Sequence, residues 1–213
     1  MVTKIPRFAF EKYKGADPYL TTHFTATDHV AGKRLSKLEL QERLGLQGEP
    51  DVPLFYWPSR LDPVQKGCQL LTELLHHLVS NHRMQVAVIA SGTFQRHFHE
   101  IVRMHGLHDR VGVRDFDEQL SHLAYAASDF IFMPSSFEPC GLPQMVAPKY
   151  GSLTVAHDTG GLHDTVQPLD VESGTGNGFL FRHFNAQGLH WAVGQALRFH
   201  GLPAEEKAVQ IAR

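Results

Sequence analysis

The chain has 213 residues and a mass of 23.9 kDa, a size that suits one domain or a very tight pair. Its 20 Lys and Arg against 22 Asp and Glu give a formal net charge of −2, which argues against a protein that holds nucleic acid or an anionic membrane mainly by bulk charge. No apolar run is long enough to span a bilayer, and the first residues lack the apolar core of a secretory signal. The two cysteines, Cys68 and Cys140, lie in unrelated contexts and indicate a reducing cytoplasm.

In chain order, the first 52 residues are less regular than the rest and contain one predicted helix over 33–44, which ends near Gly45. From Pro53 onward, short β-rich runs predict strands, and apolar residues at helical spacing predict helices between them. The expected strands are 54–59, 85–91, 110–114, 129–134, 152–156 and 178–181, and the expected helices cover about 68–78, 94–104, 120–127, 142–150 and 189–197.

This repeated strand–helix order predicts an α/β fold with a doubly wound parallel sheet. The run DFIFMP over 129–134 supports it, because strands buried on both faces are typical of parallel sheets. Right-handed crossovers bring the carboxyl ends of all such strands to one edge of the sheet, where ligands bind. We therefore expect function in the loops 59–67, 91–94, 114–117, 134–142 and 157–162.

The loop SRLDPVQKGC places Arg60 just after a strand and Lys66 at the opening of a helix. The free N–H groups of a helix N-terminus favour anions, and two cations beside them would suit a diphosphate. The alternative is that both side chains are solvated surface charges.

The stretch SSFEPCGLPQ puts Glu138 after a buried strand and before a turn that opens a helix. Gly141 permits close approach of the backbone to a ligand, and a carboxylate at the carboxyl end of a strand is typical of function. Alternatively, Glu138 caps the following helix and Cys140 only packs.

The turn DTGGLHDT has paired glycines, Gly160 and Gly161, after Thr159. It can present backbone amides to an oxyanion or a sugar hydroxyl, or it can serve as an ordinary tight connection.

Two kinds of metal site are weakly supported. The pair Asp115 and Asp117 is slight evidence for a divalent cation, and the paired histidines lack the partners of a zinc motif. The Gly-x-Ser-x-Gly elbow and the GxxxxGK[ST] loop are both absent, which excludes two large classes of enzyme.

Five sequence words, in this order and at appropriate spacing, resemble the C-terminal domain of bacterial glycogen synthases and plant starch synthases. They are SRLDPVQKG, DFIFMPSSFEPCGLPQ, YGSLTV, DTGGLHDTV and GNGFLF, and the resemblance covers about residues 16 to 200. It implies a retaining glucosyltransferase of the two-Rossmann-domain type (a B-type glycosyltransferase). Such an enzyme transfers glucose from ADP-glucose or UDP-glucose to the non-reducing end of an α-1,4-glucan, with no metal or other cofactor in the transfer step.

The resemblance also implies residue roles. Arg60 and Lys66 match the pair that neutralises the donor diphosphate, and Glu138 matches the carboxylate that contacts the donor glucose. The remaining matches are donor-binding: Phe116 stacks on the nucleobase, Cys140, Gly141 and Leu142 form the turn whose amides face sugar and phosphate, and Thr159, Gly160 and Gly161 lie beside the distal phosphate.

Three features depart from the family pattern. The Lys-x-Gly-Gly-Leu loop near the start of full-length glycogen synthases is absent, together with the N-terminal domain that would bind the glucan acceptor. Val146 stands where related transferases often have a second glutamate, and five residues separate Arg60 from Lys66 where many bacterial members have four. Two alternatives stay open: another retaining transferase of this architecture, of the sucrose or trehalose type, or a catalytically silent nucleotide-sugar-binding domain.

These inferences divide the chain into three regions. Residues 1–52 are expected to be a linker that leads into the domain, 53–200 a Rossmann-like domain for the donor nucleotide, and 201–213 the start of a C-terminal helix. The chain stops inside that helix, which predicts a fragment of a longer protein. We expect the protein in the cytoplasm, or in the plastid of a plant or alga, without nucleic acid or membrane as partner.

Overall fold

Six short strands form one parallel sheet in the computed structural model, which describes residues 17–212. Their order across the sheet is β3-β2-β1-β4-β5-β6, and each neighbouring pair is parallel. This is the order of a doubly wound sheet, so the predicted fold class is confirmed. The strands are β1 (Leu54–Trp57), β2 (Gln85–Ile89), β3 (Val111–Arg114), β4 (Phe130–Met133), β5 (Leu153–His157) and β6 (Gly178–Phe181).

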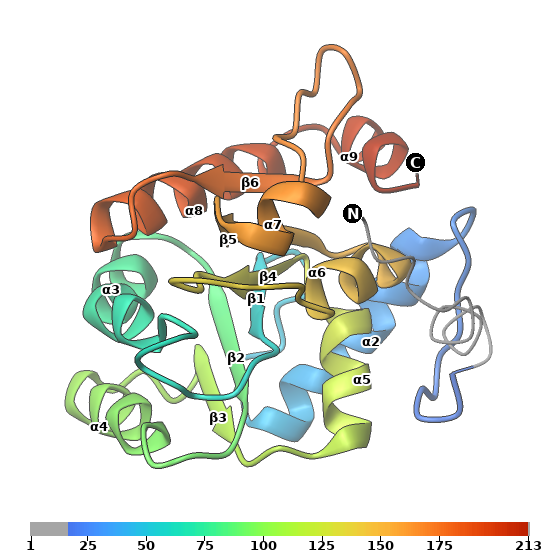
Figure 1. Cartoon of the computed structure of the whole chain (residues 1–213). Coiled ribbons are helices and arrows are strands. Elements are labelled where there is room, and N and C mark those ends of the chain that lie inside the picture. Colours follow the sequence, from blue (N-terminus) through green and yellow to red (C-terminus); the bar gives the residue numbers. More distant parts are fainter. Residues whose placement is uncertain (1–16, 213) are drawn as a thin grey trace.

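Helices cover both faces of this sheet (Figure 1). One layer contains α3 (Cys68–Asn81), α4 (Gln95–His105) and α8 (Ala186–His200), and the other contains α2 (His29–Leu44) and α5 (Glu118–Ala127). The remaining elements are α6 (Pro143–Val146), the 3₁₀ helix η1 (Ala147–Tyr150), α7 (Gly160–Thr165) and α9 (Ala204–Ala212). None of the described helices is long and apolar enough to cross a membrane.

Alternation along the strands explains the two layers, because successive side chains of a strand point to opposite faces. In β1, Phe55 and Trp57 join the core beneath α3, α4 and α8, whereas Leu54 and Tyr56 join the core beneath α2 and α5. All four β1 residues are buried, as the predicted parallel strands require.

One predicted helix is wrong as a single element. The stretch expected to be helical over 142–150 divides into α6, which ends at Val146, and the 3₁₀ helix η1. Pro148 lies in the first turn of η1, where it has no N–H to continue the α-helical ladder and restricts the backbone of Ala147 before it.

The segment before β1 contributes to the same core as the strands. Helix α2 begins at His29, four residues earlier than expected, and ends at the predicted Gly45, whose φ of 74° is left-handed. Its Leu40 and Leu44 are buried among residues of β1, β2 and α5. The predicted boundary at 52/53 is not tested by this packing, and residues 1–16 and 213 lie outside the described part.

Candidate functional site

The two halves of the sheet meet between β1 and β4, which pair directly although most of the first half separates them in sequence. The chain leaves β1 toward α3 and leaves β4 toward α6, so the loops after these strands lie at the switch point where such folds bind ligands. The loops contact each other: the Ser136 N–H donates to the Gln65 carbonyl at 2.8 Å, and the Ser136 hydroxyl donates to the Val64 carbonyl at 2.7 Å.

Two predicted catalytic residues meet at this point. The Lys66 amine lies 2.5 Å from Oε2 of Glu138, and the Ser135 hydroxyl donates to the same oxygen at 3.0 Å. Only 6% of Glu138 is exposed, so its carboxylate is a buried anion that depends on these two partners. The alternatives of a solvated Lys66 and of a Glu138 that merely caps a helix are therefore wrong: no side chain caps α6.

The N-terminus of α3 is brought against the end of β4. Gly67 precedes the helix with φ of 71°, and a Cβ at this position would lie 1.9 Å from the Pro134 carbonyl oxygen. Only glycine permits this close approach. No side chain caps α3, so its first N–H groups are available to an anion beside Lys66.

The loop that carries Glu138 rests on the N-terminus of α7. The Gly161 N–H donates to the Glu138 carbonyl at 2.7 Å. A Cβ at Gly160 would lie 2.3 Å from that same oxygen, and a Cβ at Gly161 would lie 2.1 Å from the Cys140 carbonyl oxygen. The paired glycines therefore hold two of the predicted donor-binding loops together.

Sequence reasoning missed Gln144, which is buried behind this loop. Its side-chain amide donates to the carbonyls of Cys140 at 2.9 Å and Gly141 at 3.2 Å, and to the Thr165 hydroxyl at 3.2 Å. Gly141 has φ of 73°, so the turn needs glycine there. Gln144 thus ties the turn after Glu138 to α7.

Ser135 and His157 were missed as well. His157, at the end of β5, lies against the rings of Phe181 and Phe184, and its Nδ1 donates to the Ser135 carbonyl at 2.8 Å. The position of both residues at strand ends was the available signal. Their hydrogen bonds depend on the alignment of β4 with β5, which the sequence does not display.

Arg60 and Phe116 lie farther out. Arg60 is exposed and donates to the Gln65 side-chain oxygen at 3.2 Å; within residues 17–212 no hydrogen bond or ion pair joins it to Lys66 or Glu138. Phe116 follows β3 with 63% of its surface exposed, and its N–H donates to the Ser91 hydroxyl at 3.0 Å. Leu142 and Cys140 are also exposed, and Thr159 is half-buried.

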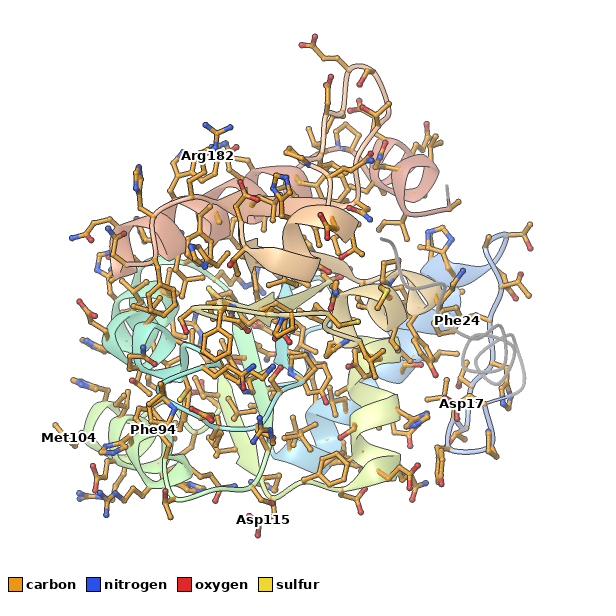
Figure 2. The ribbon with its side chains drawn as sticks, viewed as in Figure 1. Asp17, Phe24, Phe94, Met104, Asp115 and Arg182 are labelled. Atoms are coloured by element: carbon orange, nitrogen blue, oxygen red, sulfur yellow. The ribbon has the colours of Figure 1, made fainter. Side chains whose placement is uncertain are left out.

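The two aspartates weighed as a metal site serve separate local contacts. Asp115, whose side chain extends away from the ribbon in Figure 2, accepts from the Gln95 amide at 3.1 Å. Asp117 caps α5 by accepting from the Leu120 N–H at 2.7 Å. Across the described residues, no group of three or more His, Cys, Asp or Glu side chains is placed to hold a metal ion.

A parallel sheet of this order, with a lysine, a buried carboxylate and an uncapped helix at its switch point, defines a doubly wound α/β domain with a candidate anion-binding site. The glycosyl transferases group 1 family matches residues 37–212. The chain therefore belongs to that family.

The proteins of similar sequence include bacterial glycogen synthases. Glycogen synthase from Bacillus subtilis is 40% identical over 188 residues, which are 87% of this chain and 38% of that protein. Glycogen synthase from Streptococcus sanguinis is 42% identical over 187 residues, 86% of this chain and 38% of that protein. The predicted resemblance to glycogen and starch synthases is confirmed, and the chain spans only 38% of these relatives' length.

Solved structures also resemble this chain. The catalytic domain of starch synthase IV from Arabidopsis thaliana, bound to ADP and acarbose, has a TM-score of 0.85 and 35% identity, covering 95% of this chain and 42% of that one. HepE from Anabaena in complex with UDP and glucose has a TM-score of 0.62 and 23% identity, over 84% of this chain and 45% of that one. The second likeness shows the fold alone.

Proposed function

We propose that this chain is the donor-binding domain of a glycogen- or starch-synthase-type enzyme. The enzyme is a retaining glucosyltransferase that moves glucose from ADP-glucose or UDP-glucose to the non-reducing end of an α-1,4-glucan. The observation that carries the proposal is the buried Lys66–Glu138 ion pair beside the uncapped N-terminus of α3. The names of the relatives and the ADP bound to the similar starch synthase IV support it.

The chemistry fits these residues. In glucosyl transfer the diphosphate departs as negative charge develops on its oxygens while the sugar becomes oxocarbenium-like. Lys66, the first N–H groups of α3 and, from farther out, Arg60 would stabilise the departing oxygens. Glu138 would face the donor sugar. We propose that these groups supply the electrostatic work without a metal or other cofactor in the transfer step.

The remaining assignments are part of the same proposal. Phe116, exposed at the end of β3, would stack on the nucleobase, and the amides of the Cys140–Leu142 turn and of the Thr159–Gly161 loop would contact sugar and phosphate. The α-glucan acceptor would be bound by an additional N-terminal domain, in keeping with the 38% of the relatives' length that the chain spans. The free thiols of Cys68 and Cys140 favour the cytoplasm or a plastid. The formal net charge of −2 favours a protein with neither nucleic acid nor membrane as partner.

The sequence FEPCGL, with Val146 where a second glutamate would stand, favours glucan synthases over sucrose- or trehalose-type transferases. The other alternative, a catalytically silent nucleotide-sugar-binding domain, would make the same contacts to the donor as the proposed enzyme and would differ from it only in having no turnover.

Calorimetry tests the proposal directly. ADP-glucose and UDP-glucose are titrated into the chain, with glucose 6-phosphate and adenosine as ligands that lack the nucleoside diphosphate. We expect binding of at least one nucleotide-sugar, weakened in Glu138→Gln through loss of the sugar contact. Absence of binding by both nucleotide-sugars would overturn the proposal.

A further inference from the structure

A cavity lies at the opposite edge of the sheet from the loops proposed to bind the donor. It opens beside Asp129 and Phe130, where β4 begins, whereas the donor loops follow the carboxyl ends of the strands. Its volume is about 220 Å³. Helices α2 and α9, which lie on the same side of the molecule in Figure 1, form two of its walls, and the loop at Pro50 and Asp51 and the end of α8 complete it.

The charges around this cavity do not balance. Four cationic side chains (Lys33, Arg34, Lys37 and Lys207) and two carboxylates (Asp51 and Asp129) line it. Arg34 pairs with Asp51, and the Lys37 amine lies 2.5 Å from Oδ2 of Asp129. Two lysines are left over, with the histidines counted as neutral: Lys207, and Lys33, whose pKa burial lowers to about 7 so that it is charged only below that pH.

The two remaining amines bind uncharged oxygens. Lys33, fully within the protein, donates to the carbonyls of Ser128 at 2.7 Å, Tyr150 at 2.8 Å and Ala126 at 3.1 Å. Lys207, on α9, donates to the His200 carbonyl at 2.6 Å. Carbonyl groups orient an ammonium group without neutralising it, so the cavity keeps an excess of positive charge that favours an anion.

A buried imidazole supplies an independent sign of a ligand. His29 lines the cavity with only 7% of its surface exposed, and its Nδ1 donates to the Ala26 carbonyl at 2.9 Å. Its Nε2 is buried and has no hydrogen-bond partner among the described residues. Because Nδ1 carries the proton of the neutral ring, Nε2 is an acceptor. Leaving it unpaired costs on the order of 1–3 kcal/mol, which a ligand hydroxyl that donates to it would recover. His29 also lines a larger cavity of about 570 Å³.

The other walls of the cavity are apolar. Val30, Pro50, Phe199, Ala208 and Ile211 face it together with the cationic groups. A bare inorganic anion would leave this surface without contacts, whereas an anion with a small organic group would use both kinds of wall.

We propose that this cationic cavity, lined by His29, Arg34 and Lys207, binds the phosphate monoester of a small organic molecule. The phosphate lies toward the cationic side chains, and the organic group lies toward the apolar wall. The site is separate from the donor site and does not depend on the proposed transferase activity.

Protonation should be linked to this binding. Burial and the neighbouring Lys37 lower the pKa of Lys33 to about 7, and burial lowers the pKa of His200. A phosphate dianion would raise both pKa values against these effects, so the protein takes up protons when the ligand binds. Above about pH 7 the second ionisation of the ester, with a pKa of about 6, is nearly complete. Affinity therefore falls as the pH rises from about 7 to about 8, with Asp51 and Asp129 remaining ionised throughout.

The test is calorimetry of glycerol 3-phosphate binding to the chain, with ADP present at saturation to fill the proposed donor site. Measurements in two buffers of different ionisation enthalpy count the protons taken up. Lys207→Gln and Arg34→Gln, both outside the buried core, should each weaken binding about tenfold, the loss of one charged hydrogen bond. Arg103→Gln, an exposed charge on α4, is the matched control and should leave binding unchanged.

Three results would overturn the proposal. The first is the absence of binding at millimolar glycerol 3-phosphate. The second is binding that Lys66→Ala abolishes and Lys207→Gln and Arg34→Gln leave intact, which would place the ligand in the donor site. The third is equal affinity for inorganic phosphate, which would remove the role of the apolar wall. Binding with proton uptake and with loss in both cavity variants would support it, whatever the outcome for nucleotide-sugars.

Discussion

At the scale of single residues, Lys66 combines a structural contact with a proposed role in binding the ligand. Its amine neutralises the buried Glu138 carboxylate at 2.5 Å, and it stands beside the uncapped start of α3, where the diphosphate is expected. Lys66→Ala should therefore weaken ADP binding far more than adenosine binding, because an unpaired Glu138 would also repel the diphosphate. Arg60→Ala should act in the same direction but less strongly, since Arg60 is exposed. Calorimetry with both ligands decides, and equal losses for ADP and adenosine would assign the two side chains to folding.

Glu138 is expected to act on the sugar rather than on the nucleotide. In an enzyme with both domains, Glu138→Gln keeps the shape of the side chain and removes its charge, so kcat should fall by orders of magnitude. ADP affinity should stay the same or rise slightly, because a negative charge near the diphosphate is gone. Steady-state kinetics and ADP titrations measure the two effects separately, and near-normal turnover would contradict the assigned role.

At the scale of elements, the contact between α7 and the Glu138 loop depends on Gly161. A methyl group there would lie 2.1 Å from the Cys140 carbonyl oxygen, so the loop or the helix must shift. Gly161→Ala should cost about 1–3 kcal/mol of unfolding free energy and weaken nucleotide-sugar binding. Gly194→Ala on α8 is the control, since its methyl group would approach nothing closer than 4.0 Å and alanine favours the helix by about 0.5–1 kcal/mol. Urea unfolding measures the free energy of unfolding of both variants. Equal changes in the two variants would contradict the role assigned to Gly161.

Helix α2 is attached to α5 and η1 through the buried Lys33, whose amine donates to the carbonyls of Ala126 and Tyr150, and this attachment depends on pH. Burial lowers the pKa of Lys33 from 10.5 to about 7, so between these values the unfolded chain holds a proton that the folded chain has released. The free energy of unfolding should therefore rise with pH over this window, by at most about 1.4 kcal/mol per pH unit from this group. Below about pH 7 the full cost of burying the charge remains.

Urea titrations at several pH values from about 6 to about 9 measure this slope. In Lys33→Met the rise above pH 7 should flatten, because the titrating amine is gone, whatever the change in absolute stability. Arg34→Gln, one residue farther along α2, should keep the slope. An identical slope in the native chain and Lys33→Met would show that another group is responsible.

The elements themselves were largely predictable because their signals are local. Apolar runs located all six strands, and Gly45 located the end of α2. The helix over 142–150 was mistaken because its apolar spacing continues through Pro148, whose missing N–H and effect on Ala147 outweigh that spacing. Pattern alone also placed the start of α2 too late, since its first turn, His29–Gly32, ends in glycine, a poor helix former.

Candidate site residues within a single loop could be predicted from the sequence, but contacts between different loops could not. Lys66, Glu138 and the paired glycines were found because each stands beside a strand end or a helix start. Ser135, Gln144 and His157 were not found, because their contacts run between segments that only the folded sheet aligns. A hydroxyl, an amide and an imidazole are common in sequence, and their role here comes from tertiary distance.

At the scale of the whole molecule, the chain has a complete doubly wound sheet with helices on both faces, and the loops proposed to bind the donor follow the carboxyl ends of its strands. It spans 38% of the length of the curated relatives. We expect the chain as it stands to fold and to bind nucleotide-sugar weakly, yet to transfer no glucose to glycogen. Folding follows from two buried cores on one sheet, and weak binding follows because a single wall carries the donor contacts.

Transfer should be absent because the acceptor is not positioned, and proximity alone can supply roughly 7–11 kcal/mol of a barrier. Water would also reach the sugar and weaken the electrostatic stabilisation of the departing diphosphate by Lys66 and α3. The measurement is incorporation of radiolabelled glucose into glycogen, from ADP-glucose and from UDP-glucose separately, at high protein concentration. Glu138→Gln is the control for any signal. Incorporation that this substitution abolishes would prove that the domain suffices, and the argument from a missing acceptor wall would then be wrong.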